Sequence, residues 1–250
     1  MAYLVLLRHG ESTYNQKNLF TGWTDCPLTE KGEEEARKAA SLLKENGFTS
    51  FDYVQTSVLE RAIRTTEIVL EELKLSSLPI HLDYRFNERH YGALEGYNKA
   101  LMTEKLGYDK VFAWRRTFKG RPPLLKEDDK RNPRFDVKYQ GIDESLLPLG
   151  ESLEDTYKRV LPAYNDDIVP ELKENRTVLL VAHANSLRAL VMYLDKLKEE
   201  DAPSVYLPTG IPLVYRMNAE LQILGKKFLG DEKEVEQKIK ESLYRGFHQK

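Results

Sequence analysis

The sequence predicts an α/β fold, a three-layer sandwich in which helices flank a mostly parallel central sheet. Two short apolar runs, residues 3–7 and 178–182, are uninterrupted, which is typical of strands buried on both faces of a sheet. Stretches with helical spacing of apolar residues alternate with the strand-like runs along the chain. With 250 residues, the chain is long enough to bury a sizeable core.

Strands and helices follow one another over most of the chain. In order, we expect a strand at 3–7, a helix from 29–30 to about 47, a strand at 51–56, a helix from about 57 to 73, a strand at 79–84, a helix at 152–168, a strand at 177–182, a helix from about 186, strands at 212–217 and 222–228, and a helix at 231–244. Ser57 and Glu60 have the spacing of a capping box, which places Arg61 in the first turns of the second helix. Ser or Asn after His183 is expected to cap the helix there. The strands at 212–217 and 222–228 are predicted to pair as a hairpin that turns at 218–221.

Residues from about 95 to 150 interrupt this alternation. They are rich in Lys, Arg, Asp and Pro and contain short helical pieces such as 108–118. We expect a helical insertion that forms a lid over the carboxyl ends of the strands, since long insertions in compact α/β domains are often functional; a surface excursion without a function is the alternative. The charged segment 231–250 is expected to be a helix followed by a polar tail. Without repeats or a low-complexity linker, residues 1–250 are predicted to form a single domain.

Composition excludes several functional classes. The chain has 38 Lys and Arg against 40 Asp and Glu, a net charge of −2, so nothing global indicates a nucleic acid or an anionic membrane as partner. The single cysteine, Cys26, excludes an internal disulfide and a zinc site built from cysteines. The apolar runs are shorter than the roughly 18 residues of a membrane span. No leader peptide is visible, so we expect a cytoplasmic protein.

Two histidines each follow a predicted core strand. Arg8 and His9 come directly after the first strand, and His183 comes after the strand at 177–182 and before a helix. Open α/β sheets bind ligands beyond the carboxyl ends of such strands. A neutral imidazole can attack phosphorus and carry the phosphoryl group, while an adjacent arginine neutralises its oxygens. Each histidine alone could be structural, but together they predict a shared phosphate site that also uses the helix amides after His183.

Loop residues and one carboxylate could complete such a site. Asn15, Thr21 and Gly22 could hydrogen-bond phosphate oxygens, although turn-forming residues have the same composition. Glu88 could donate and accept a proton if burial raises its pKa. The alternative for Glu88 is a surface carboxylate paired with Arg89.

Cations in the insertion could bind a second anionic group. Arg115 and Arg116 are adjacent on a predicted helix, and Lys99 lies upstream of them. Two arginines can hold a phosphate or a carboxylate in bidentate fashion. A solvated helix face is the alternative, because cationic pairs on helices are usually exposed.

Several short motifs together carry a family resemblance. They are Leu-Arg-His-Gly-Glu-Ser at 7–12, Asn15, Thr-Gly-Trp-Thr-Asp at 21–25, Thr-Ser-Val-Leu-Glu-Arg-Ala-Ile at 56–63, Asn-Glu-Arg-His-Tyr-Gly at 87–92, Trp-Arg-Arg at 114–116, Glu-Ser-Leu at 151–153, Ala-His-Ala-Asn-Ser-Leu-Arg-Ala-Leu at 182–190 and Pro-Thr-Gly-Ile-Pro-Leu-Val-Tyr at 208–215. Over nearly its whole length the chain resembles the cofactor-dependent phosphoglycerate mutases of the histidine phosphatase superfamily. Arg-His-Gly indicates only the superfamily, whereas the motifs at 87–92 and 114–116 are specific to the mutase branch.

The resemblance implies a role for each residue. It implies that His9 carries the phosphoryl group, that His183, Arg8 and Arg61 stabilise the phosphorus centre in transfer, and that Glu88 is the general acid and base. Substrate-binding roles are implied for Arg8, Asn15, Thr21, Gly22, Arg61, Glu88, Arg89, His90, Tyr91, Lys99, Arg115, Arg116, Ala184 and Asn185. The reaction implied is the glycolytic and gluconeogenic interconversion of 3-phosphoglycerate and 2-phosphoglycerate, with 2,3-bisphosphoglycerate priming His9. No metal is expected, because arginines and an imidazolium take its place, and a homodimer is expected from the resemblance alone.

Two positions depart from the family pattern, and other functions stay open. Ala184 stands where the family usually has Gly, and residues 247–250 are not the usual mutase tail. A bisphosphoglycerate synthase or phosphatase would use the same phosphohistidine. A binding module without turnover is disfavoured because His9, His183, Arg8, Arg61 and Glu88 are all present. A two-metal phosphoesterase is disfavoured because no dense cluster of Asp and His is evident.

Overall fold

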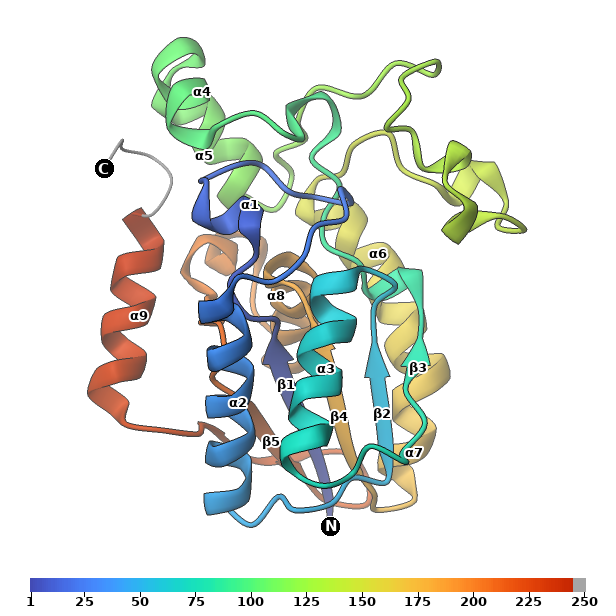
Figure 1. Ribbon diagram of the computed structural model, residues 1–250, viewed down its shortest axis with the longest axis vertical. Coiled ribbons are helices and arrows are strands. Elements are labelled where there is room, and N and C mark those ends of the chain that lie inside the picture. The colour runs from blue at the N-terminus through green and yellow to red at the C-terminus, as the bar shows by residue number, and fades with distance from the viewer. Residues whose placement is uncertain (245–250) are drawn as a thin grey trace.

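The strands form one sheet in the order β3-β2-β4-β1-β5-β6 (Figure 1). Their bounds are β1 Ala2–Arg8, β2 Tyr53–Thr56, β3 His81–Leu82, β4 Thr177–Ala182, β5 Leu213–Met217 and β6 Ile223–Phe228. Neighbours from β3 to β1 are parallel, and β5 and β6 are antiparallel. The computed structural model describes residues 1–244, with side chains described up to residue 241. The predicted α/β fold with a mostly parallel sheet is confirmed.

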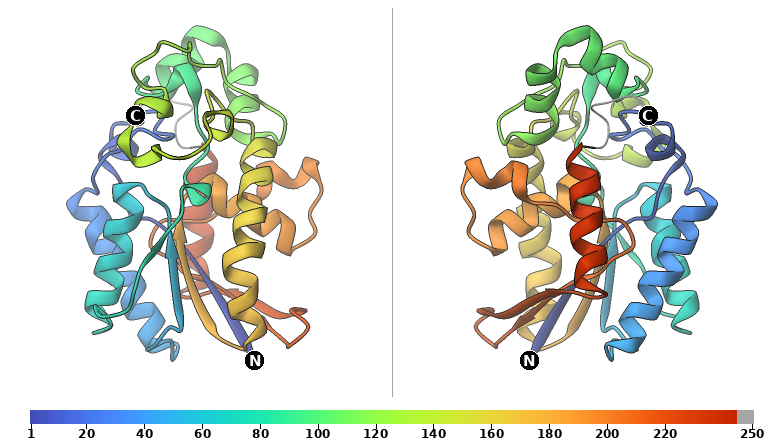
Figure 2. Two further views of the ribbon diagram at one scale, coloured as in Figure 1. Left: turned by 90° about the vertical axis from the view of Figure 1, so that its right-hand side faces the viewer. Right: turned by 90° about the vertical axis from the view of Figure 1, so that its left-hand side faces the viewer.

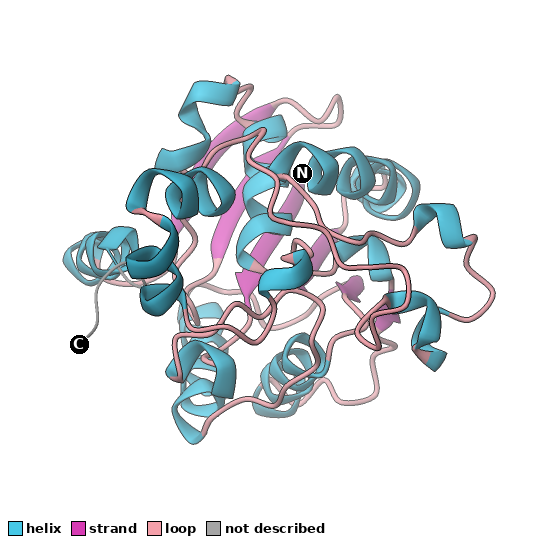
Figure 3. Cartoon of the chain, turned by 90° about the horizontal axis from the view of Figure 1, so that it is seen from above, coloured by secondary structure: helices cyan, strands magenta, loops and turns pink. Residues whose placement is uncertain are grey.

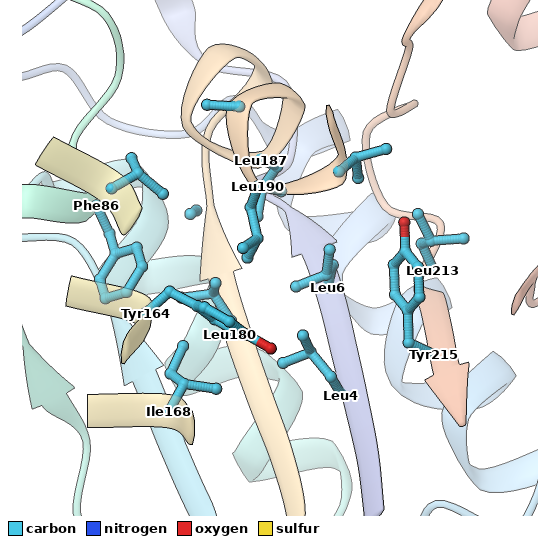
Figure 4. Packing of buried hydrophobic residues seen from close by; sticks show 14 of the residues in the cluster. Leu4, Leu6, Phe86, Tyr164, Ile168, Leu180, Leu187, Leu190, Leu213 and Tyr215 are labelled. Carbon is cyan, nitrogen blue, oxygen red and sulfur yellow. The ribbon is translucent and has the colours of Figure 1, made fainter. Parts of the chain in front are cut away.

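Alternating residues of the central strands enter two separate cores. Leu4 and Leu6 of β1 pack on one face of the sheet with Leu180 of β4 (Figure 4), whereas Val5 and Leu7 pack on the other face. The first face is covered by α6 (Leu153–Ala163), α7 (Val169–Lys173) and α8 (Ala184–Leu194). The opposite face is covered by α2 (Glu30–Glu45) and α3 (Glu60–Glu72), as Figure 2 shows. A strand buried on both faces needs an uninterrupted apolar run, and this explains the pattern at residues 3–7.

Apart from the strand at the sheet edge, the strand boundaries agree with the predictions to within two residues. The fourth strand has its predicted bounds, and β5 and β6 form the expected hairpin, with Asn218 N–H donating to the Gln222 carbonyl at 3.1 Å. Of the predicted strand at 79–84, only His81 and Leu82 pair in the sheet. Both side chains are exposed, so this edge strand has no buried face to extend it.

Three helix boundaries differ from the predictions. The second predicted helix begins at Glu60, but its N-cap is Leu59, whose side chain makes no cap bond, so the Ser57 capping box is wrong. The N-cap of α8 is His183 rather than Ser or Asn, although Ser186 Oγ accepts from the His183 N–H at 3.1 Å. The helix predicted at 152–168 begins after Ser152, in a capping box, as expected. Its end differs, because it continues through a π-helical turn, Tyr164–Ile168, into α7, which ends at Lys173.

The insertion lies above the carboxyl ends of the parallel strands (Figures 1 and 3). Its helices are α4 (Lys99–Leu106) and α5 (Tyr108–Arg116), and the short helix α1 (Thr13–Gln16) lies nearby. Short 3₁₀ turns occur at Tyr84–Phe86, Gly92–Leu94, Pro133–Phe135, Val137–Tyr139, Glu144–Leu146 and Glu199–Ser204. The helical pieces expected in the insertion are therefore present over the sheet edge where the two histidines were predicted to meet.

The last described helix, α9 (Glu232–Tyr244), stands beside α2 (Figure 1). Lys38 on α2 pairs with Glu234 on α9 at 2.5 Å. The charged helix predicted at 231–244 is thus confirmed, whereas the atypical tail at 247–250 lies outside the described residues. Across the described residues, none of the helices combines the length and apolar character that a membrane span requires.

Candidate active site

A cavity of about 310 Å³ opens where β1 and β4 end, beneath the insertion. Predicted site residues in its lining are Arg8, Asn15, Thr21, Gly22, Glu88, Tyr91, Lys99, Arg115, Arg116, Ala184 and Asn185. His9, Arg61, Arg89 and His183 are at most 2% exposed and lie next to the lining through chain neighbours or hydrogen bonds. The structure therefore brings together residues that are as much as 177 positions apart in the chain.

The two histidines lie side by side. In the parallel register, Arg8 is opposite Ala182, and the next residues along both strands are His9 and His183. Their ring centroids are 4.9 Å apart, with 58° between the ring planes. The backbone N–H of His9 donates to the Ala182 carbonyl at 3.1 Å, which fixes the two strand ends against each other. Sheet pairing alone thus creates the two-histidine arrangement.

A backbone contact sets the tautomer of His9. Its Nδ1 lies 2.7 Å from the carbonyl oxygen of Gly10. A carbonyl can only accept, so Nδ1 carries the proton and the lone pair of the neutral ring is on Nε2. His9 therefore has its nucleophilic nitrogen on the ring edge away from Gly10, as attack on phosphorus requires.

His183 is oriented by a serine that the sequence analysis had assigned to a helix cap. Ser57 Oγ lies 2.7 Å from His183 Nε2 and accepts from the Leu59 N–H at 3.2 Å. The Ser57 hydroxyl can donate to His183 Nε2 while its oxygen accepts from Leu59, and in that arrangement the ring proton of His183 is on Nδ1. His183 Nδ1 is buried and has no hydrogen-bond partner among the described residues. An unpartnered buried donor next to His9 is suited to an acceptor oxygen of a bound group.

Both imidazoles are neutral in the folded protein at pH 7. Burial, followed by the charges of Arg61 and Arg8, lowers the pKa of His9 well below its usual value. Burial, followed by Arg61 and His9, lowers the pKa of His183 in the same way. The imidazolium expected from the sequence is therefore not the resting form of His183. Neutral His9 is the state that can act as a nucleophile.

Two arginines flank the histidines. Arg8 Nη1 donates to Tyr206 Oη at 3.0 Å and to the Leu207 carbonyl at 3.1 Å, while its Nε is buried without a partner among the described residues. Arg61 donates from Nη2 to the Gly22 carbonyl at 2.8 Å and from Nη1 to the Thr24 carbonyl at 3.1 Å. Arg8 thus keeps a donor for a ligand, and Arg61 holds the loop that contains Gly22 and Thr24 in place.

The loop that contains Thr21 and Gly22 is also held by Glu95, a residue that sequence reasoning missed. The buried Glu95 carboxylate accepts the N–H groups of Trp23 at 3.0 Å, Thr24 at 3.2 Å and Tyr91 at 3.0 Å. Gly22 has a φ of +54°, and a Cβ there would lie 1.7 Å from Glu95 Oε1. Only glycine fits this close approach in the left-handed region.

Glu88 is a buried carboxylate in the cavity wall, so the alternative of a surface pair with Arg89 is wrong. Its side chain accepts the N–H groups of Arg89 at 2.8 Å and Asn185 at 3.0 Å, both on Oε1. The Arg89 guanidinium donates elsewhere, to Tyr91 Oη at 2.9 Å and to the Arg115 carbonyl at 2.7 Å. Glu88 lines the cavity, so its carboxylate lies where it can meet a substrate hydroxyl.

Buried guanidinium groups surround the far part of the cavity. Arg89 is fully buried, and Arg115 and Arg116 are 9% and 6% exposed, so the solvated alternative for the pair is wrong. Burial and then the neighbouring Arg116 lower the pKa of Arg115 to about 10. The same two causes lower the pKa of Arg188 to about 9. Cations held this close out of water favour an anionic ligand between them.

Arg188 and Tyr206 also line the cavity and were not predicted. Arg188 donates to Asn185 Oδ1 at 2.9 Å and to the Val205 carbonyl at 2.9 Å. Helical spacing could have found Arg188, because it lies four positions after Ala184 and so shares its helix face. Tyr206 lies in a loop without periodicity, and no signal in the sequence could have identified it.

The side chain of His90, a predicted substrate-binding residue, contacts Gly92 and Glu95 and does not line the cavity. Its Nδ1 accepts from the Gly92 N–H at 2.9 Å and lies 3.2 Å from Glu95 Oε1. It is not part of the cavity lining, and its ring packs 5.8 Å from that of Trp23. In the described part of the chain, no three His, Cys, Asp or Glu side chains are grouped so that they could hold a metal ion.

Comparison with known proteins agrees with this geometry. The chain matches the model of the histidine phosphatase superfamily (branch 1) over residues 4–130 and 123–211. It is 48% identical over 236 residues to a 2,3-bisphosphoglycerate-dependent phosphoglycerate mutase of Treponema denticola, covering 94% of this chain and 95% of that protein.

Solved structures with lower identity share the fold. A mycobacterial glucosyl-3-phosphoglycerate phosphatase matches with a TM-score of 0.68 and 23% identity, covering 91% of this chain and 97% of that one. The alpha-ribazole phosphatase of Shigella flexneri matches with a TM-score of 0.62 and 24% identity, covering 92% and 99%. By the match to its model and by the close relative, the chain belongs to the histidine phosphatase superfamily.

Proposed function

We propose that the protein interconverts 3-phosphoglycerate and 2-phosphoglycerate in glycolysis and gluconeogenesis through a phosphohistidine on His9. The observation that carries the proposal is the bond from His9 Nδ1 to the Gly10 carbonyl at 2.7 Å, which leaves Nε2 of a neutral ring as nucleophile. The 48% identity to a mutase over nearly the whole chain supports the substrate assignment.

In the proposed cycle, His9 Nε2 attacks a phosphorus atom and the bond from phosphorus to the hydroxyl oxygen breaks. The electron pair stays on that oxygen, which takes a proton from Glu88. In the return step, Glu88 takes a proton from the accepting hydroxyl, and the phosphoryl group leaves His9 for that oxygen. Arg8, Arg61 and the Nδ1–H of His183 stabilise the negative charge of the group in transfer.

Buried donors without partners fit a bisphosphorylated acid. Among the described residues they include Arg8 Nε and His183 Nδ1 near His9, and Nε and Nη1 of Arg89. When bound, 2,3-bisphosphoglycerate supplies the phosphoryl group that primes His9. Lys99, Arg115 and Arg116 line the part of the cavity that would hold the carboxylate or the second phosphate, with Asn15 and the loop at Thr21 and Gly22 as further contacts.

A mutase must return the phosphoryl group to a small acid without losing it to water. The insertion at 95–150, which carries α4 and α5 above the cavity, is proposed as the lid that excludes water. A cytoplasmic location and a homodimer belong to the same proposal.

A coupled assay tests the function. The protein is mixed with 3-phosphoglycerate and EDTA, with and without 2,3-bisphosphoglycerate, and formation of 2-phosphoglycerate and of free phosphate is followed. Isomerisation that requires the bisphosphate, persists in EDTA and is absent in His9→Ala supports the proposal. Release of free phosphate without isomerisation would replace it with a phosphatase.

A further inference from the structure

Arg159 and Glu151 form a largely buried ion pair behind the cavity wall. Arg159 lies on α6, and Glu151 precedes the N-cap of that helix. Their side chains are 12% and 4% exposed. Arg159 Nε donates to Glu151 Oε1 at 2.6 Å and Nη2 donates to Oε2 at 2.8 Å, so the two planar groups meet through a pair of bonds that fixes their orientation. Neither residue lines the cavity.

The guanidinium of Arg159 also binds three carbonyl groups of the segment that carries Glu88. Nη1 donates to the carbonyl oxygens of Arg85 at 2.7 Å and Asn87 at 2.9 Å, and Nη2 donates to that of Glu88 at 2.8 Å. One side chain thus holds the peptide groups on both sides of the Glu88 Cα. A lysine has a single nitrogen and cannot make all of these bonds.

Glu151 and Trp23 hold the same segment from other directions. Glu151 Oε2 accepts from the His90 N–H at 2.8 Å, and the Glu151 N–H donates to the His90 carbonyl at 2.8 Å. Trp23 Nε1 donates to the Glu88 carbonyl at 2.6 Å. The backbone of Glu88 is therefore fixed independently of the two N–H groups that bind its carboxylate.

We infer that Arg159, held in orientation by Glu151, is a positioning residue for proton transfer by Glu88. The inference rests on the proposed function, in which Glu88 exchanges a proton with the substrate hydroxyl. A displacement of about 1 Å at a reacting group can cost about 100-fold in rate. A backbone that carries an acid and base therefore needs rigid support from residues that do not touch the substrate.

The leaving group separates positioning of Glu88 from general damage to the site. Transfer to His9 from a sugar-acid hydroxyl needs a proton on the departing oxygen, because an alkoxide is a poor leaving group. With 4-nitrophenyl phosphate, the bond from phosphorus to the phenolic oxygen breaks and the electron pair leaves as nitrophenolate, which needs no proton. Both reactions use the same His9, but only the first depends on the position of Glu88.

The test compares these two reactions in Arg159→Lys. We expect the kcat of isomerisation to fall about 10-fold or more, whereas the burst of nitrophenolate, one equivalent per site, changes little. Glu151→Gln should lower the kcat of isomerisation by a smaller factor and leave the burst nearly unchanged, and it decides the question if Arg159→Lys does not fold. Lys158→Gln is the matched control, because it breaks the exposed pair with Glu154 on the same helix and should leave both reactions unchanged.

Equal losses in the isomerisation and the burst would overturn the inference and assign Arg159 a purely structural role. An unchanged isomerisation rate in both variants would also overturn it. Failure of the parent protein to isomerise phosphoglycerate is a separate result, because it contradicts the proposed function before any variant is considered.

Discussion

Ser57 Oγ lies 2.7 Å from His183 Nε2, inside the protein, where both side chains are fully buried. The Ser57 hydroxyl can donate to Nε2 in this contact, and in that tautomer the ring proton is on Nδ1 and is directed away from Ser57. The bond thus connects the segment that precedes α3 to the part of the cavity next to His9. It also shows how a residue with no direct role in chemistry sets the donor that the transferring group meets.

Removing this hydroxyl should slow catalysis more than it changes binding. In Ser57→Ala, His183 Nε2 loses its partner, and we expect kcat to fall roughly 10- to 100-fold, since an unsatisfied buried group costs about 1–3 kcal/mol. Steady-state isomerisation kinetics measure the effect. Thr66→Val is the control, because it removes a buried hydroxyl on α3 that bonds the Ala62 carbonyl and does not contact His183. Equal losses in the two variants would contradict the role of Ser57.

Glu88→Gln should separate proton transfer from structure. The amide oxygen can still accept the N–H groups of Arg89 and Asn185, but the side chain no longer exchanges a proton at neutral pH. We expect kcat for isomerisation to fall about 10²- to 10⁴-fold with KM changed little. The nitrophenolate burst is the internal control and should persist. Unchanged isomerisation would remove Glu88 from the acid and base role.

Two glycines with positive φ test the packing of the substrate loop. Gly22→Ala would place a Cβ against Glu95, whereas a Cβ at Gly96, where φ is +85°, meets no atom within 4 Å. Gly22→Ala and Gly96→Ala both carry the backbone strain of the left-handed region, but only Gly22→Ala adds overpacking. We expect Gly22→Ala to cost about 1–3 kcal/mol more in urea unfolding and to raise KM. Similar unfolding free energies for the two would show that the loop yields.

Stability should fall as pH decreases below the usual pKa of histidine. The folded-state pKa values of His9 and His183 are lowered, so between those values and about 6.5 the unfolded chain binds more protons than the folded one. The contribution of the two histidines to the free energy of unfolding is therefore complete above pH 6.5. It is lost as pH falls, by about 1.4 kcal/mol per pH unit for each histidine. Urea unfolding between pH 7.5 and 5.5 measures this slope, which should decrease in His9→Gln. A slope unchanged in that variant would contradict the pKa direction.

The sequence could predict the parts of the molecule that depend on local pattern. The strand at Thr177–Ala182 needs an uninterrupted apolar run because both faces are buried, and its bounds were predicted correctly. Thr29 caps α2 through its own side chain, a contact between near neighbours that the sequence also signals. Arg8, His9 and His183 were placed near one another because strand ends of a parallel sheet meet at one edge.

Contacts between distant segments could not be predicted in this way. Ser57 has the local pattern of a cap, yet its partner is 126 positions away. Glu95 binds the loop at Trp23 across 72 positions, and Arg159 binds the Glu88 carbonyl across 71. The first contact is set by the pairing of β2 with β4, and the other two by how the insertion and α6 pack on the sheet. The family resemblance implied a substrate-binding role for His90, but its ring is directed to Glu95.

The most direct test of the central claim is to locate the phosphate on the protein. The parent and His9→Ala are incubated with 2,3-bisphosphoglycerate, digested under alkaline conditions and examined by mass spectrometry. The account predicts an acid-labile phosphate on His9 in the parent and none at this position in the variant. A phosphate on another residue, or isomerisation by a parent protein that never becomes phosphorylated, would contradict the claim that His9 carries the phosphoryl group.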